Sequence, residues 1–130
     1  MKINIISVIF IASFISCMHN FKDYEIQSFN QKICERTDIT TPEELILMYL
    51  NYPQNEVIPE ISIKVKNLGE NNYKIILVSD NIRDDSVKAE KIIIIAQMLN
   101  SRWKVYKIIK SWKCWKGRGN SLFWHGDYCT

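Results

Sequence analysis

Apolar and polar residues in the segment TTPEELILMYLNYP follow the period of an amphipathic α-helix. Its apolar side consists of residues spaced three or four positions apart: Leu45, Met48, Tyr49 and Tyr52. Thr41 can cap the first turn, Pro42 suits the first helical position, and Glu44 completes a capping box with Thr41. Because proline cannot continue a helix, Pro53 is expected to end it. The pattern predicts a helix over residues 41–52.

After this helix the period changes to two, which is typical of strands with one polar face. In the segment EISIKVKNL, isoleucine and valine alternate with serine and lysine. Turn-forming residues lie at positions 68–72 and at Asn100 and Ser101, and a polar loop covers residues 80–86. The pattern predicts four strands, at residues 60–68, 72–80, 87–99 and 102–115.

This order of elements predicts an α+β fold, with one helix packed on a four-stranded antiparallel meander sheet. The order resembles the cystatin-like and NTF2-like architectures, in which one helix lies across a curved sheet. In the last strand, odd positions such as Trp103 and even positions such as Tyr106 are both apolar. Both sheet faces are therefore expected to be partly covered, the second by residues 21–34 or by another subunit.

The N-terminus has the pattern of a secretory signal peptide. Lys2 supplies a positive charge, and residues 3–15 are mostly apolar. As a helix this run would rise about 20 Å, less than the roughly 30 Å of a bilayer core. Such a length is typical of the apolar region of a signal peptide, so residues 1–16 are predicted to direct export. The alternative is a buried N-terminal strand or helix of the fold.

The residues FISC at positions 14–17 resemble the lipobox of bacterial lipoproteins, where a small residue precedes the modified cysteine. The resemblance implies that Cys17 becomes a lipid-bearing N-terminus that anchors the chain to a membrane. In that family an aspartate after the cysteine favours the inner membrane, whereas this chain has Met18, which favours the outer membrane. The alternative is a soluble periplasmic or secreted protein.

Residues 17–38 are interpreted as a lipid-anchored tether and N-terminal segment. Ile26, Phe29 and Ile33 would share one helical face, but the segment is otherwise polar and has no evident cap. A single α+β domain with a disulfide-closed tail is predicted over residues 39–130, a length typical of one domain.

The cysteines indicate how the tail is closed, because an exported protein meets oxidising conditions. If Cys17 carries lipid, three of the four cysteines remain. Cys114 and Cys129 are nearest in sequence and are predicted to form a disulfide, which would stabilise the fold by about 3 kcal/mol. Cys34 would then be buried and free, or paired with another molecule.

The segment CWKGRGN, followed by Trp124 and Cys129, resembles the C-terminal signature of a group of small uncharacterised exported bacterial proteins. The resemblance implies export and this tail topology, but no reaction. Gly117 and Gly119 allow turn conformations, and Arg118 between them could bind a partner's carboxylate or phosphate. Alternatively, Arg118 pairs within its own domain or is simply solvated. The candidate binding residues are Arg118, Trp115, Trp124 and Lys116.

A metal site is a weaker interpretation of the same tail. Cys114, His125 and Cys129 would need a fourth ligand, either Asp127 or His19. Their spacing matches no familiar zinc motif, and oxidation removes thiolates. No metal or cofactor is predicted.

Seven lysines and arginines, and no acidic residue, lie between Arg102 and Arg118. Lysines three positions apart alternate between the faces of a strand, so this run alone predicts no basic stripe. The net charge is only +3. Nucleic-acid binding is therefore not predicted, whereas weak attraction to anionic head groups or cell-wall polymers is.

Motifs for catalysis are weak. Ser121, His125 and Asp127 have the residue types of a triad, but they lie in one short loop without a recognisable oxyanion element. Asp84 and Asp85 are adjacent, so they favour a turn rather than a shared proton. No catalytic residue is predicted.

These features predict an exported envelope protein with a binding or structural role, anchored through lipid on Cys17 and contacting an envelope protein. The expected binding surface is the uncovered sheet face with the tail around Arg118 and Trp124. One alternative is an inhibitor or immunity-type protein against an envelope enzyme or toxin. Another is a small NTF2-like enzyme with a pocket inside the sheet.

Overall fold

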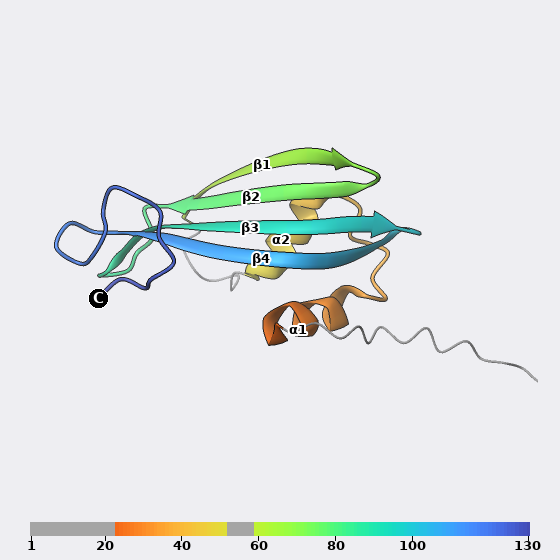
Figure 1. Ribbon diagram of the computed structural model, residues 1–130, viewed down its shortest axis with the longest axis horizontal. Helices are drawn as coiled ribbons and strands as arrows, with labels where there is room; N and C mark the ends of the chain where they lie inside the picture. Colours follow the sequence, from red (N-terminus) through yellow and green to blue (C-terminus); the bar gives the residue numbers. More distant parts are fainter. Residues whose placement is uncertain (1–22, 52–58) are drawn as a thin grey trace, which may run out of the picture.

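The computed structural model describes residues 23–51 and 59–130. Two helices precede four strands: α1 (Tyr24–Ile33), α2 (Pro42–Leu50), β1 (Glu60–Gly69), β2 (Asn72–Asp80), β3 (Val87–Leu99) and β4 (Arg102–Cys114). The strands form one antiparallel sheet in the order β1-β2-β3-β4 (Figure 1). The predicted α+β class and meander are confirmed, with a second helix added. The predictions for the signal peptide, Cys17 and His19 lie outside the described residues.

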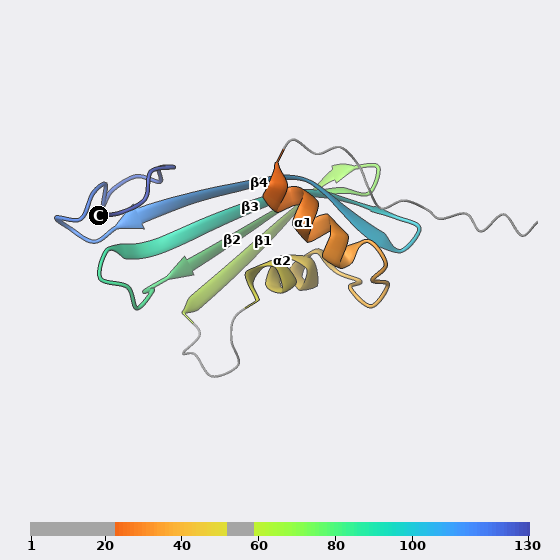
Figure 2. The same cartoon turned by 90° about the horizontal axis from the view of Figure 1, so that it is seen from below.

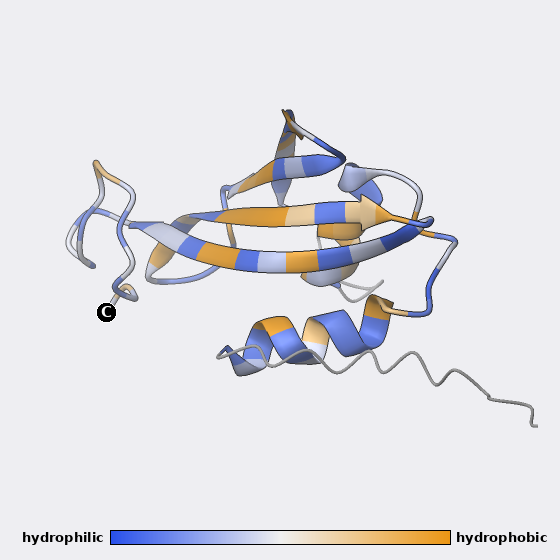
Figure 3. Cartoon of the chain, turned by 45° about the vertical axis from the view of Figure 1, so that its right-hand side comes forward, coloured by the Kyte–Doolittle hydropathy of each residue, from blue (hydrophilic) through white to orange (hydrophobic). Residues whose placement is uncertain are grey.

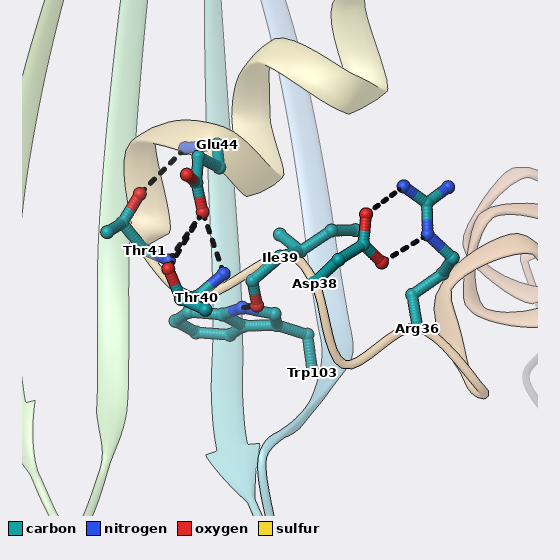
Figure 4. Close-up of polar contacts among 7 residues, drawn as sticks. All are labelled: Arg36, Asp38, Ile39, Thr40, Thr41, Glu44 and Trp103. Carbon is teal, nitrogen blue, oxygen red and sulfur yellow. Dashed lines mark hydrogen bonds and ion pairs between the residues drawn. The ribbon is translucent and has the colours of Figure 1, made fainter.

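Helix α2 begins at the predicted capping box. Thr41 Oγ1 accepts the Glu44 N–H at 3.2 Å, and Glu44 Oε2 accepts the N–H groups of Thr41 and Thr40 at 3.0 and 2.7 Å (Figure 4). These backbone donors, that of Thr40 first, lower the pKa of Glu44. The helix ends before the predicted Pro53, because Asn51 takes a left-handed conformation with φ 42°.

Helix α1 replaces the predicted tether. Asp23 caps it by accepting the Glu25 N–H at 2.9 Å, a cap that the sequence interpretation overlooked. Ile26, Phe29 and Ile33 are buried, so the weak apolar stripe in the sequence is a packing face. The folded part of the chain therefore begins before residue 39.

Both helices pack on the same face of the sheet (Figure 2). The core between them and the sheet includes Leu45, Ile46, Ile75, Leu77 and Ile94, all fully buried. The prediction that residues 21–34 cover the second face is therefore wrong for α1, which is the part the structure describes. That segment shares the first face with α2.

The two edges of the sheet differ. At the β4 edge, Asn30 of α1 donates to the Val105 carbonyl and accepts the Val105 N–H, both at 2.8 Å. This buried amide occupies backbone groups that an edge strand would otherwise expose. Trp103 fixes the helix connection by donating its indole N–H to the Ile39 carbonyl at 2.9 Å. No described residue hydrogen-bonds to the outer backbone edge of β1.

Cys34, at the end of α1, is half-buried and disulfide-bonded. The prediction of a buried free cysteine, or one paired with another molecule, is therefore wrong. In the described ranges, no helix is long and apolar enough to cross a membrane.

Candidate binding surface

The sheet face opposite the helices, called the open face, is the first part of the candidate surface. Strand pairing arranges its central side chains in three rows across β1 to β4: Lys66, Lys74, Ile95 and Lys107; Lys64, Ile76, Ile93 and Ile109; Ser62, Val78, Lys91 and Ser111. Polar and apolar segments alternate visibly along β4 (Figure 3). Since paired residues of an antiparallel sheet share a face, isoleucines and lysines are mixed across the open face.

Lysines dominate the charge of this face. Lys113 lies beyond the last row, opposite Ala89, while the acidic residues Glu60 and Asp80 pair at the corner where β2 ends. The pKa of Lys91 is lowered, first by burial and then by the charges of Lys113 and Lys74. The open face therefore has excess positive charge that the described residues do not neutralise.

The sequence did not predict this basic face. The alternation expected within β4 holds for Lys107, Lys110 and Lys113, of which only Lys110 lies on the helix face. It fails for Lys104, because the register shift beside Ala96 places Lys104 on the open face with Lys107. However, lysines from all four strands meet only through the pairing register. The alternating lysines of residues 60–68 were the one visible signal.

The second part of the surface is the C-terminal loop, defined as residues 115–128 and closed by the Cys114–Cys129 disulfide. This disulfide confirms the predicted pair. Backbone hydrogen bonds tie the loop down: Trp112 and His125 exchange two, at 2.9 and 3.1 Å, and Cys114 N–H donates to Asn120 at 2.9 Å. Gly119 has φ 132°, and a Cβ there would lie 2.9 Å from Cys114 Sγ, so glycine is required.

Trp124 joins the loop to the open face. The ammonium groups of Lys91 and Lys113 lie 4.7 and 4.8 Å from the centre of its ring. Both distances are within the range of cation–π attraction. The predicted binding residue Trp124 is therefore half-buried between two lysines of the open face.

The other predicted binding residues have different environments. Trp115 donates its indole N–H to the Asp84 carbonyl at 3.0 Å, which anchors the ring to the loop before β3. Arg118 and Lys116 are exposed. Among described residues, the Arg118 guanidinium has no hydrogen bond or ion pair. Arg118 is therefore solvated in this structure and available to a partner.

The most exposed apolar side chains of the loop were not predicted as binding residues. Leu122 is 75% exposed, Phe123 is 70% exposed and Tyr128 is 66% exposed. Asn120 Oδ1 accepts the N–H groups of Leu122 and Phe123 at 3.1 and 3.0 Å, so their backbone is held in a turn. In the sequence, the adjacent apolar residues Leu122 and Phe123 between the two bridged cysteines could have indicated an exposed apolar tip.

The sulfur atoms of Cys114 and Cys129 and a ring nitrogen of His125 lie within 4.8 Å of one another. The two sulfurs are bonded together and are not thiolates, so they cannot ligate zinc in this form. His125 Nε2 lies 3.4 Å from Cys114 Sγ. In the described residues, neither Ser121 nor Asp127 hydrogen-bonds to His125 through its side chain, so a triad is not assembled.

A polar cluster on the opposite face joins both helices to β4. Glu25 of α1 accepts hydrogen bonds from Tyr49 of α2 and, at 2.6 Å, from Lys110. Burial and the bond to Glu25 raise the pKa of Tyr49 to about 12. Burial opposes the charge of Lys110, but its bonds to Glu25 and Tyr49 raise its pKa overall. Sequence inspection could not find this cluster, because its members are far apart in the chain.

An open cavity of about 410 Å³ lies beside this cluster, between α1 and α2, and includes Phe29, Lys32 and Met48 in its lining. The space between the helices and the sheet is filled by the buried aliphatic core. The described residues therefore provide no support for a pocket inside the sheet.

Comparison of the chain with family models, curated proteins and solved structures finds no match.

Proposed function

We propose that this is an exported envelope protein that binds an anionic partner through the open face and the C-terminal loop. The observation that supports this role most is the combination of uncompensated lysines and accessible isoleucines on one sheet face. Trp124 and the exposed apolar residues of the loop lie at one end of that face. Exposed apolar side chains gathered among charges are typical of interaction surfaces.

The proposed location rests on the N-terminal sequence, where the apolar run and the lipobox-like residues favour export. The sequence favours two mature forms, and the Cys34 bridge of the structure can be present only in the lipid-free one. A lipid on Cys17 occupies its sulfur, so a lipidated Cys17 cannot form a bridge with Cys34. An intact mass with acyl chains would identify an outer-membrane lipoprotein, and a lipid-free chain with two reducible bridges would identify a soluble periplasmic protein.

Neutralising two lysines of the open face is the direct test. The double variant Lys91→Gln and Lys113→Gln should weaken binding to isolated envelopes by about thirtyfold, because each lysine near an anionic surface contributes about 1 kcal/mol. The matched control is Lys32→Gln with Arg36→Gln, which removes the same charge from exposed positions in α1 and the connection after it, outside the sheet. Equal loss in both double variants would show that only net charge matters and would contradict the proposal.

An inhibitor or immunity-type role is the second candidate. It is favoured by the disulfide-closed loop, which carries both the solvated Arg118 and the exposed Phe123. The test is a pull-down from envelope extract with the natural chain and with Arg118→Ala. Capture of a single protein by the natural chain alone would support this role, and no capture by either chain would contradict it.

A further inference from the structure

We infer that the anionic partner is a lipid bilayer, and that the C-terminal loop inserts Leu122 and Phe123 into the bilayer interface. This inference rests on the proposed function, since it names the partner of the same surface. In this arrangement the lysines of the open face and the loop contact anionic head groups.

The apolar residues of the loop have the exposure that insertion requires. Leu122 and Phe123 are adjacent, and each leaves at least 70% of its surface in water. Keeping such side chains in water is unfavourable, and their transfer into an apolar environment is favoured. The fold does not bury them, although Cys129 and Val87 nearby are buried.

The loop is also held in one conformation before it meets a membrane. The disulfide closes its base, the Trp112–His125 bridge fixes one side, and Asn120 holds the turn that presents the apolar pair. A loop that is already ordered loses less conformational entropy on binding. In Figure 1 the C-terminal loop projects beyond the end of the sheet, where a flat surface can be reached.

The loop that carries the apolar pair also carries or contacts several cations. Lys116 and Arg118 lie in the loop itself, and Lys91 and Lys113 hold Trp124, the residue after Phe123. Asp127 is the only acidic residue between positions 115 and 130. Aromatic residues and lysines are the side chains that settle at the head-group level of a membrane.

The type of cation favours lipid over an acidic protein. By register, the cations in the central rows of the open face and at Lys113 are all lysines, and Arg102 lies at the far end of the face, opposite Leu99. Arginine is enriched and lysine depleted in protein interfaces, whereas lysine ammonium groups attract head groups as point charges. A cavity lined by Glu60, Ser62 and Asp80 lies at the acidic corner of this face, away from the lysine rows.

Depth-dependent quenching tests the inference in the full chain. Two reporter variants, Phe123→Trp and Leu99→Trp, place a new tryptophan either in the loop or at the opposite end of the sheet. Leu99 is 49% exposed, so its replacement is the matched control. Each variant is compared with the natural chain on vesicles of brominated phosphatidylglycerol or brominated phosphatidylcholine, and co-sedimentation measures the bound fraction in the same samples.

On phosphatidylglycerol vesicles, the tryptophan introduced at position 123 should be quenched about threefold more than that at position 99, because interfacial side chains lie about 5–10 Å deep. Phosphatidylcholine should give little quenching of either. Equal quenching at the two positions, equal quenching on the two lipids, or failure to sediment with either vesicle would overturn the inference. If envelope binding still depends on Lys91 and Lys113, the proposed function survives with an acidic protein or polymer as partner.

Discussion

The two faces of the sheet are built from the same four strands, yet they treat charge in opposite ways. On the helix face, Lys110 is neutralised by Glu25, which ties it to α1. On the open face, Lys91 and Lys113 have the ring of Trp124 between them and repel each other. On the covered face a cation holds the fold together, whereas the described residues give Lys91 and Lys113 on the open face no acidic partner.

The largest expected difference between the faces is in the stability lost when adjacent isoleucines of β3 are replaced by alanine. Ile94 is fully buried on the helix face, whereas Ile93 is half-buried on the open face. Ile94→Ala should lower the free energy of unfolding by about 2–5 kcal/mol, because it leaves a cavity. Ile93→Ala should lower it by about 1 kcal/mol or less. Denaturant unfolding measures both, and equal losses would show that the open face is covered in solution.

This contrast also shows what sequence can predict. The bounds of β2 and β3 agree with the structure, because their apolar runs end at turn-forming residues. The start of α2 was predictable because its capping box is local. Helix α1 was missed because its apolar stripe is narrow and Asp23 was not considered as its cap. Most residues of α1 are polar, as in a tether, and only the structure shows that its apolar side chains are buried.

The candidate surface was predictable only in part. The disulfide, Trp124 and Arg118 are local features of the tail, and sequence spacing was enough to find them. The basic face depends on the register of three strand pairs, and the Glu25–Lys110 ion pair joins residues that are 85 positions apart in the chain. Such long-range contacts are set by tertiary packing and leave no pattern in a short window of sequence.

A smaller loss of stability is expected at acidic pH, when Glu25 on the helix face becomes protonated. Burial would raise the pKa of Glu25, but bonds from Lys110 and Tyr49 lower it below its ordinary value of 4.5. Its stabilising effect is therefore complete above pH 4.5 and is lost as pH falls through the lower folded-state value. Because the pair is partly exposed, the loss should be no more than about 1 kcal/mol.

Thermal unfolding across this acidic range checks that expectation. Glu25→Gln should remove part of the pH dependence, whereas Glu43→Gln, at an exposed site on α2, should leave it in place. An unchanged pH profile in the Glu25 variant would show that Lys110 is not paired in solution.

The smallest expected effect is a slight increase in stability when Lys91 on the open face loses its charge. Burial and neighbouring lysines lower the pKa of Lys91, so its charge is unfavourable in the folded protein at neutral pH. That cost disappears as pH rises through the lowered value toward 10.5, the ordinary pKa of lysine. Lys91→Gln should therefore stabilise the fold by no more than about 0.5 kcal/mol, whereas Lys110→Gln should destabilise it. Destabilisation by both would mean that Lys91 has a structural role.

The most direct test of the central claim is the reactivity of lysine amines, measured by mass spectrometry after brief acetylation of the protein in intact envelopes and in purified form. If the open face is the binding surface, Lys64, Lys91 and Lys113 should react several-fold more slowly in envelopes, while Lys32 on α1 should react equally in both. Equal reactivity of the open-face lysines in the two preparations, or protection of Lys32 instead, would contradict the claim.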